Sequence, residues 1–120
     1  NVCVTITLMS YQVEELLLPD GRSPYAAWFA TLDPIAAAKV SVAAARMEQG
    51  NLSNVEWFRG IGEYKIDWGP GYRIYLAKDG LRIVVLLGGG SKKRQQQDID
   101  EAVTLWEDHK RRKAQMKKGA

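Results

Sequence analysis

Residues 60–87 contain the pattern that most restricts the fold, because apolar and polar residues alternate through two consecutive stretches. The first stretch is residues 63–68 and the second is residues 72–77, and Gly69-Pro70-Gly71 separates them. Period-two alternation predicts strands, and a glycine-rich turn between two such strands predicts a hairpin. After a further turn at Asp79-Gly80, residues 81–87 are almost continuously apolar, which is typical of a central strand covered on both faces.

The first half of the chain predicts one strand and two helices. Alternation in residues 2–8, which resumes weakly at residues 11–13, predicts an N-terminal strand. Ser23-Pro24 and Asp33-Pro34 each place a capping side chain before a proline, so each predicts a helix start. The second of these helices is expected to span residues 35–49, and the two together predict a helical hairpin.

A closing helix is predicted from about Asp98, because Ile99, Ala102, Val103 and Trp106 recur at helical spacing. The resulting order β-α-α-β-β-β-α predicts an α+β fold, with an antiparallel β-meander, an N-terminal helical hairpin and a C-terminal helix. We interpret residues 1–120 as a single domain, residues 1–9 as an N-terminal extension, and residues 110–120 as a basic, disordered tail.

Composition excludes several classes of function. The chain of 120 residues has one cysteine, Cys3, and one histidine, His109, which excludes an internal disulfide and a Cys/His metal cluster. No apolar run approaches the roughly 18 residues of a membrane span, so we expect a cytoplasmic protein. From Ser91 onward, nine Lys or Arg residues stand against five Asp or Glu residues, although the whole chain is only +3. This basic end favours an anionic partner such as nucleic acid, and a solvated tail is the alternative.

The alternation also predicts which charged side chains share a face of the sheet. Tyr64, Ile66, Trp68, Ile74 and Leu76 are expected to face the helices, which leaves Glu63, Lys65, Asp67, Arg73 and Tyr75 on the opposite face. On this exposed face Lys65 and Arg73 are expected to be cross-strand neighbours, with Lys92, Lys93 and Arg94 as a cationic rim.

Such a surface would bind a phosphodiester, and Tyr72 or Tyr75 would stack on a base. The alternative interpretation is a solvated face on which Glu63 or Asp67 pairs locally with Lys65 or Arg73.

The residues also resemble a known family through a series of short motifs in a fixed order. The chain from Tyr11 to about Arg112 resembles the phage-derived, HigB-like branch of the RelE/ParE toxin superfamily, the addiction-module killer proteins. The matching pieces are Tyr11-Gln12-Val13-Glu14-Glu15, Trp28-Phe29-x-x-Leu32-Asp33, Gly50-Asn51, Gly60-x-Gly62-Glu63, Gly69-Pro70-Gly71-Tyr72-Arg73-Ile74-Tyr75, Leu86-Leu87-x-Gly89-Gly90-x-Lys92-x-x-Gln95 and Asp98-Ile99-x-x-Ala102.

This resemblance implies a RelE-like fold and the toxin of a type II toxin–antitoxin system. Relatives of this kind cut mRNA on the ribosome without a metal or a small-molecule cofactor, and a cognate antitoxin protein neutralises them. The implied partners are therefore an antitoxin, the ribosome and mRNA. The implied catalytic residues are Lys65, Arg73, Lys92 and Lys93. The predicted exposed face and its rim add Asp67, Tyr72, Tyr75 and Arg94 as candidate RNA-binding residues.

Physical chemistry suggests individual roles for these side chains. Arg73 is always charged and fork-shaped, which suits the stabilisation of a phosphorane. Lys65 acts as the general base only if neighbouring cations lower its pKa, and Asp67 or Glu63 is the alternative base.

Three departures from the family pattern keep two other functions open. Lys65 stands where this branch usually has Arg, and Ser91 stands where Asp usually precedes Lys92. The region after the last strand also lacks a Tyr or His that would serve as an acid. The alternatives are a ParE-like toxin that inhibits gyrase and a weakened toxin that acts only as an antitoxin-binding protein.

Overall fold

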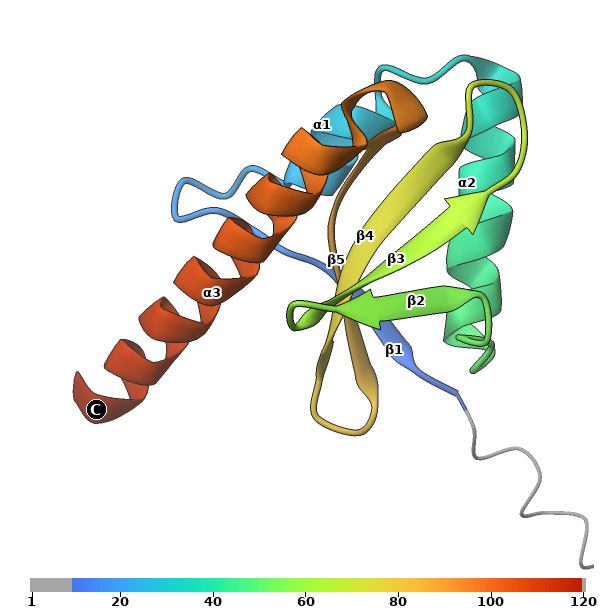
Figure 1. The fold of residues 1–120 in the computed structure, drawn as a ribbon. Coiled ribbons are helices and arrows are strands. Elements are labelled where there is room, and N and C mark those ends of the chain that lie inside the picture. The colour runs from blue at the N-terminus through green and yellow to red at the C-terminus, as the bar shows by residue number, and fades with distance from the viewer. Residues whose placement is uncertain (1–9, 120) are drawn as a thin grey trace, which may run out of the picture.

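The computed structural model describes residues 10–119, so the strand expected at residues 2–8, the extension at residues 1–9 and Cys3 lie outside the described residues. Figure 1 shows the described chain as a twisted sheet with helices on both sides. The elements in chain order are β1 (Gln12–Glu15), α1 (Pro24–Phe29), α2 (Pro34–Glu48), β2 (Val55–Phe58), β3 (Ile61–Ile66), β4 (Tyr72–Asp79), β5 (Ile83–Ser91), the 3-10 helix η2 (Lys92–Arg94) and α3 (Gln95–Gly119).

The sheet has five strands in the order β1-β5-β4-β3-β2. Strands β2 to β5 form an antiparallel meander, whereas β1 pairs with β5 in parallel. The α+β class is therefore confirmed, but the sheet is mixed and contains one strand that the sequence did not predict. That strand is β2, a segment of four residues that includes Trp57 and Phe58.

Both predicted helix starts are confirmed by their capping contacts. The Ser23 hydroxyl accepts a hydrogen bond from the Ala26 N–H at 3.0 Å, and an Asp33 carboxylate oxygen accepts one from the Ala36 N–H at 2.9 Å. Each cap satisfies a backbone donor that the helix cannot pair, which is worth about 1 kcal/mol. The caps set where α1 and α2 begin, and both helices contribute to the hydrophobic cluster on one face of the sheet.

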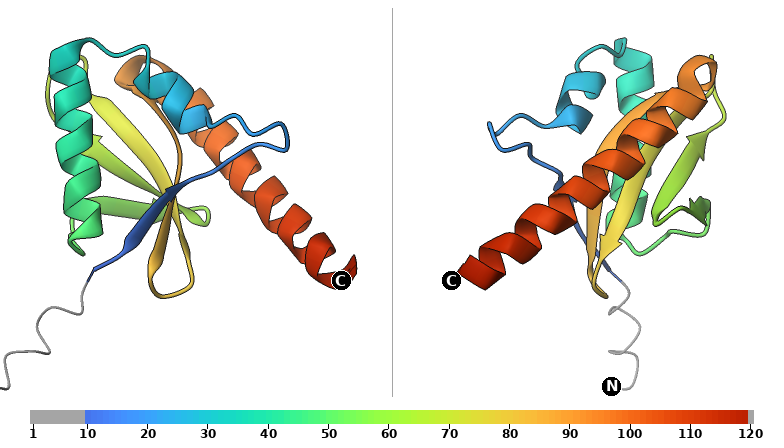
Figure 2. Two further views of the ribbon diagram at one scale, coloured as in Figure 1. Left: turned by 180° about the vertical axis from the view of Figure 1, so that it is seen from behind. Right: turned by 60° about the vertical axis from the view of Figure 1, so that its left-hand side comes forward.

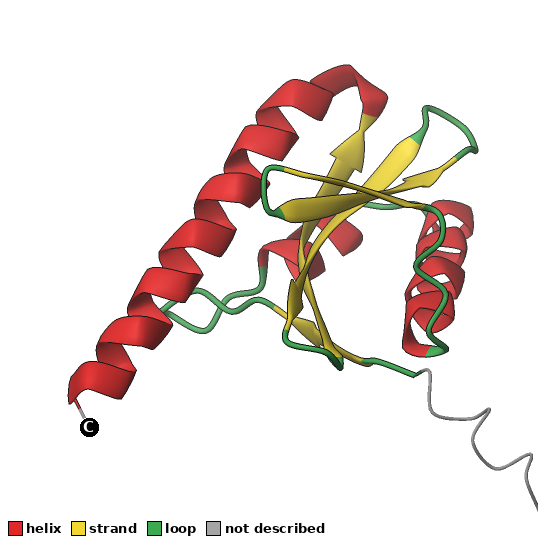
Figure 3. Ribbon diagram, turned by 60° about the horizontal axis from the view of Figure 1, so that its bottom comes forward, coloured by secondary structure: helices red, strands yellow, loops and turns green. Residues whose placement is uncertain are grey.

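Two hydrophobic clusters lie on opposite faces of the sheet. Tyr64, Ile74 and Leu76 are buried with residues of α1 and α2, as the alternation predicted. The opposite face was expected to be exposed, and this is wrong: α3 lies across it, and Ile99, Ala102, Val103 and Trp106 complete a second cluster there. Figure 3 shows α2 and α3 on opposite sides of the sheet.

The three consecutive glycines at residues 88–90 lie within β5. A Cβ on Gly89 would lie 2.3 Å from the Trp28 ring, and a Cβ on Gly90 would meet the Asp98 carboxylate. The missing side chains therefore let α1 and α3 approach the strand closely. Asp98 is also three residues into α3, because the helix begins at Gln95.

Helix α3 runs on past the sheet to Gly119, as Figure 2 shows. The expectation of a disordered tail at residues 110–120 is therefore wrong for the described residues. Lys113 contributes to this extension, because its ammonium group lies 2.7 Å from the Asp79 carboxylate at the tip of the β4–β5 hairpin. Among residues 10–119, no helix combines the length and apolar composition that a membrane crossing requires.

We expect Gly89→Ala to lower the free energy of unfolding by about 1–3 kcal/mol, because the added methyl group overpacks against Trp28. Gly88→Ala is the matched control, since a Cβ there meets no atom within 4 Å. It should change stability by less than about 0.5 kcal/mol. Urea denaturation of both variants measures the difference, and equal losses would contradict the close packing of Trp28 on Gly89.

Candidate functional site

Lys65 and Arg73 are directly opposite each other in the β3–β4 ladder, as the sequence predicted. The hairpin between β2 and β3 has a two-residue loop, Arg59-Gly60, in which both residues have positive φ. Such a loop makes the flanking residues Phe58 and Ile61 a hydrogen-bonded pair. Counting along β3 from there, Lys65 and Arg73 form a non-hydrogen-bonded pair, whose side chains approach most closely, with Cβ atoms about 4.5–5.5 Å apart.

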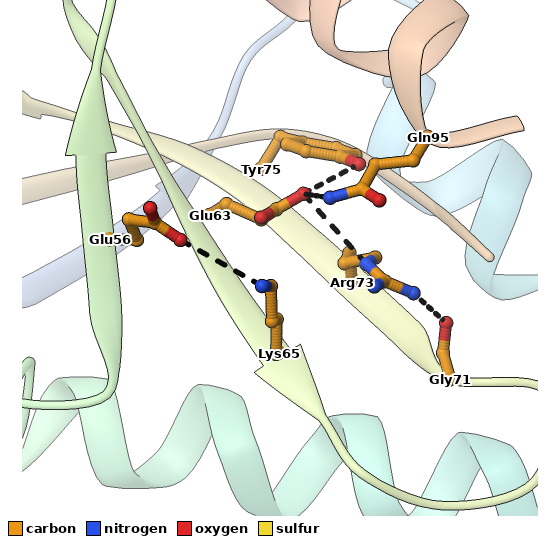
Figure 4. A network of polar contacts seen from close by, with 7 residues as sticks. All are labelled: Glu56, Glu63, Lys65, Gly71, Arg73, Tyr75 and Gln95. Carbon is orange, nitrogen blue, oxygen red and sulfur yellow. Dashed lines mark hydrogen bonds and ion pairs between the residues drawn. The ribbon is translucent and has the colours of Figure 1, made fainter. Parts of the chain in front are cut away.

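The two head groups of this pair nevertheless point to different neighbours (Figure 4). The Lys65 ammonium lies 3.8 Å from the Glu56 carboxylate of β2, and the Lys65 side chain is about half exposed. The Arg73 side chain is only 9% exposed, and its Nη1 donates to the Gly71 carbonyl at 2.7 Å. The pair therefore combines one accessible cation with one cation that the fold holds in place.

A buried carboxylate lies beside Arg73. Glu63 is 1% exposed, and its Oε2 accepts hydrogen bonds from the Tyr75 hydroxyl at 3.1 Å and the Gln95 side-chain amide at 2.9 Å. Arg73 Nε lies 3.8 Å from the same oxygen, which is an ion pair without a hydrogen bond. Figure 4 shows these contacts converging on Glu63 from β4 and from the start of α3.

The Arg73 guanidinium has N–H donors that make no hydrogen bond within the described residues. Within residues 10–119, Nε is the one buried side-chain polar atom that lacks a hydrogen-bond partner. No hydrogen bond joins Nη2 to another of these residues, so its donors are not used within this part of the chain. Arg73 can therefore offer Nη2 to an anion while Nη1 stays on the Gly71 carbonyl.

The Gly71 carbonyl connects Arg73 to Lys92. It accepts the Lys92 N–H at 3.0 Å as well as Arg73 Nη1 at 2.7 Å. Gly71 has a φ of 78°, and a Cβ there would lie 3.1 Å from Arg73 Nη1. Only glycine adopts this conformation without strain and leaves that space for the guanidinium. The turn thus places Lys92, an exposed residue, beside the pair of cations on β3 and β4.

The other predicted site residues are placed differently. Lys93 and Arg94 are exposed in η2, but Arg94 is held toward α3, with Gln97 at 2.9 Å and Glu101 at 3.5 Å. Asp67 is exposed in the β3–β4 turn, and the half-buried Tyr72 ring stacks against Trp68 with centroids 6.2 Å apart.

Two predicted roles are corrected by burial. Tyr75 was expected to stack on a base, but it is 1% exposed in the cluster beneath α3 and its hydroxyl is bound to Glu63. Glu63 was an alternative general base, but it lies in the same buried layer and cannot reach a substrate. The error has one cause in both cases, because the alternation reports which residues share a face and not which helix covers it.

Sequence reasoning missed the roles of Gln95 and of the Gly71 carbonyl. Gln95 was part of the motif series that carried the family resemblance, but no pattern linked it to a residue 32 positions earlier. The glycine-proline-glycine turn indicated a hairpin, but not that one of its carbonyls would bind a side chain. Both contacts depend on where α3 and η2 begin relative to the sheet.

Burial also changes the acid–base properties around Arg73. It raises the pKa of the Tyr75 hydroxyl well above its usual range, and the nearby Glu63 carboxylate raises it further, so Tyr75 is a neutral hydrogen-bond donor. Burial against β5 likewise raises the pKa of Asp98, and the Glu101 charge adds to this effect. Among the described residues, no cluster of three or more His, Cys, Asp or Glu side chains has the arrangement of a metal site.

Comparisons with known proteins add no assignment to this geometry. A scan against protein-family models matched no family, and searches of curated proteins and of solved structures gave no match.

The raised pKa of Asp98 predicts a pH dependence of stability. The native carboxyl binds its proton more tightly than the unfolded one, so folding loses stability as pH rises above about 3.9. The unfolding free energy of Asp98→Asn minus that of the wild type should therefore increase from pH 3 to pH 7, as followed by urea denaturation.

Asp100→Asn on the same helix is the matched control of opposite sign. Hydrogen bonds from Arg59 and Gln96 lower the pKa of Asp100, so its contribution to stability is present above about pH 3.9 and is lost at lower pH. Its variant-minus-wild-type difference should decrease from pH 3 to pH 7. Parallel trends in the two variants would contradict the assigned environments.

Proposed function

We propose that the protein is the toxin of a type II toxin–antitoxin pair and that it cuts mRNA on the ribosome without a metal ion. The observation that carries this proposal is the meeting of Lys65, Arg73 and Lys92 at one end of the sheet. Lys65 and Arg73 are a cross-strand pair, and the Lys92 N–H shares an acceptor with the Arg73 guanidinium. These cations come from three consecutive parts of the meander and provide a compact anion-binding surface.

The chemistry of this surface suits cleavage of an RNA phosphodiester. The ribose 2′-oxygen attacks phosphorus as a base takes its proton, the bond to the 5′-oxygen breaks, and that oxygen is protonated as it leaves. Negative charge builds on the non-bridging oxygens during this step. Arg73, with Nη1 fixed and Nη2 free, is the donor for that charge, and Lys65 and Lys92 supplement it.

Lys65 and Asp67 are the accessible candidates for the general base, because both are exposed and Lys65 is the cross-strand neighbour of Arg73. Glu63 is excluded from this role by its burial. Lys93 is the further cation next to Lys92, and Tyr72 is the remaining aromatic residue for contact with RNA.

The arrangement of the elements supports a RelE-like fold for the same chain. Two N-terminal helices precede an antiparallel meander, and a C-terminal helix follows it, in the order that the resemblance to the RelE/ParE superfamily implies. Strand β1 pairs in parallel with β5 and forms the edge of the sheet opposite β2.

A groove between α2 and β3 supports the second half of the proposal, an antitoxin partner. It has a volume of about 560 Å³ and is lined on the helix side by Ile35, Lys39, Val42 and Arg46. Ile35 and Val42 are 60% and 50% exposed, so the helix side of the groove offers two aliphatic side chains to a partner. The two cations beside them favour a segment of an antitoxin that combines apolar and acidic residues.

The edge of β3 beside this groove is free for pairing. Strand β2 ends opposite Tyr64, so no strand of the described sheet pairs with β3 beyond this position. A free edge next to an apolar groove is the geometry that accepts an added strand. An antitoxin segment bound there would bring acidic groups next to Lys65, which explains how binding would silence the toxin.

The proposal predicts growth arrest with cleaved mRNA when the protein is induced in cells. Lys65→Ala combined with Lys92→Ala should relieve the arrest without unfolding the protein, because both side chains are exposed. Arg73→Ala should reduce cleavage by on the order of 100- to 1000-fold, as expected when a donor to the developing charge is lost. Arg82→Ala, an exposed cation at the other end of β5, is the control.

Primer extension on a reporter mRNA measures this cleavage directly. Arrest that persists in the Lys65/Lys92 and Arg73 variants would contradict the assigned site. A DNA-damage response with intact mRNA would instead indicate a gyrase-directed toxin.

RNA binding through this surface should depend steeply on salt. Four phosphate contacts, from Lys65, Arg73, Lys92 and Lys93, predict a log–log slope near −3, at roughly −0.7 for each contact with single-stranded RNA. The Lys65/Lys92 double variant should bring the slope to about −1.4 by the same count. Fluorescence anisotropy with a 2′-O-methyl RNA measures both slopes, and a flat response in the wild type would rule out a phosphate-binding face.

A further inference from the structure

We propose that Glu63 is a positioning residue that orients the Arg73 guanidinium, and that Tyr75 and Gln95 hold Glu63 in the required place. This inference rests on the proposed function, since it assigns a role around the arginine of that site. It is carried by the network in Figure 4, in which one carboxylate oxygen meets the Arg73 side chain, a hydroxyl and an amide.

Glu63 carries a negative charge that the fold must compensate. A carboxylate that is 1% exposed is costly unless a cation and hydrogen-bond donors compensate it. Arg73 is the cation within ion-pair distance of Glu63 in the described chain, and Tyr75 and Gln95 are its side-chain donors. The two residues therefore belong together, and the position of each depends on the other.

Glu63 and Arg73 form an ion pair without a short hydrogen bond between them. A carboxylate that meets arginine side-on with two short hydrogen bonds would occupy the donors that a phosphate needs. Here the Glu63 oxygen stays 3.8 Å from Nε, while Tyr75 and Gln95 hold it at 3.1 and 2.9 Å. Tyr75 and Gln95 thus keep the carboxylate close enough to attract Arg73 without a short hydrogen bond to its guanidinium. Nη2 therefore remains without a partner.

The Arg73 guanidinium is also bound at Nη1. Nη1 is fixed on the Gly71 carbonyl, at 2.7 Å, within the turn that also binds the Lys92 N–H. Arg73 is therefore held at two points, by a carboxylate near Nε and by a carbonyl at Nη1. Two fixed points on a planar group define its orientation, which is the form of preorganisation that catalysis by charge stabilisation requires.

Gln95 gives the network a connection to the helix that covers it. It is the first residue of α3, and its amide crosses to Glu63 on β3. The placement of α3 therefore determines where the carboxylate sits, and through it where Arg73 points. This explains why a polar side chain lies at the point where the helix meets the sheet.

The test is cleavage of mRNA on programmed ribosomes by purified wild-type protein and by Glu63→Gln, Tyr75→Phe and Gln95→Ala. We expect Glu63→Gln to lower kcat by on the order of 100-fold, the cost of a misplaced reactive group, with KM for the mRNA-bearing ribosome changed by less than about threefold. Tyr75→Phe and Gln95→Ala each remove one donor and should lower kcat by about tenfold. Glu107→Gln, an exposed carboxylate of α3, is the matched control and should leave kcat unchanged.

The pH dependence separates positioning from acid–base chemistry. With a positioning role, the low-activity variants keep the wild-type pH profile, because no titrating catalytic group has been removed. If the pH profile of kcat for Glu63→Gln no longer falls at low pH, the inference is overturned and Glu63 is the general base. Tyr75→Phe keeps the experiment decisive if Glu63→Gln fails to fold, since it removes a single hydroxyl.

The outcomes also separate this inference from the proposed function. If wild-type protein does not cleave mRNA, the proposed function fails. If wild-type protein cleaves, Arg73→Ala does not, and Glu63→Gln, Tyr75→Phe and Gln95→Ala retain full kcat, then the proposed function stands and the positioning role is excluded.

Discussion

Arg73 is a largely buried charged side chain near the beginning of β4, the central strand of the sheet, and much of the structure around it compensates for that placement. A buried guanidinium without partners would cost several kcal/mol. Glu63 supplies the opposite charge from the neighbouring strand, and the Gly71 carbonyl supplies an acceptor from the preceding turn. The first residue of α3, Gln95, then supplies a donor to the carboxylate and so ties the helix to the pair.

The close approach of helices to the sheet depends on the same region. Gly90 lies opposite Arg73 in the β4–β5 ladder, and the Asp98 carboxylate occupies the space where its side chain would be. In the same way, the Trp28 ring of α1 occupies the space where a side chain of residue 89 would be. These glycines allow helices on both sides to pack against β5, which keeps the polar network beneath α3 away from water. The buried network and the exposed cations Lys65 and Lys92 are thus two layers of one arrangement.

The elements that carry their own local signal were predictable from the sequence. The alternation around Gly69-Pro70-Gly71 correctly placed Lys65 opposite Arg73, because register in a hairpin follows from turn position and period two. The Ser-Pro and Asp-Pro helix starts were correct for a similar reason, since a cap is a contact within four residues. The parallel pairing of β1 with β5 and the covering of the second face by α3 have no local signal. They depend on how distant apolar surfaces meet, and so the burial of Glu63, Arg73 and Tyr75 was missed.

The function proposed for this surface follows from its two layers. The buried residues orient Arg73 and leave its Nη2 group without a partner. The exposed lysines Lys65 of β3 and Lys92 of η2 lie around that group. The most direct measurement is a cryo-electron microscopy structure of the protein on a ribosome that carries 2′-O-methylated mRNA, which cannot be cut. The account predicts a phosphate of the mRNA within hydrogen-bond distance of Arg73 Nη2, between Lys65 and Lys92. A phosphate bound instead along the basic end of α3, with Arg73 facing away from the mRNA, would contradict it.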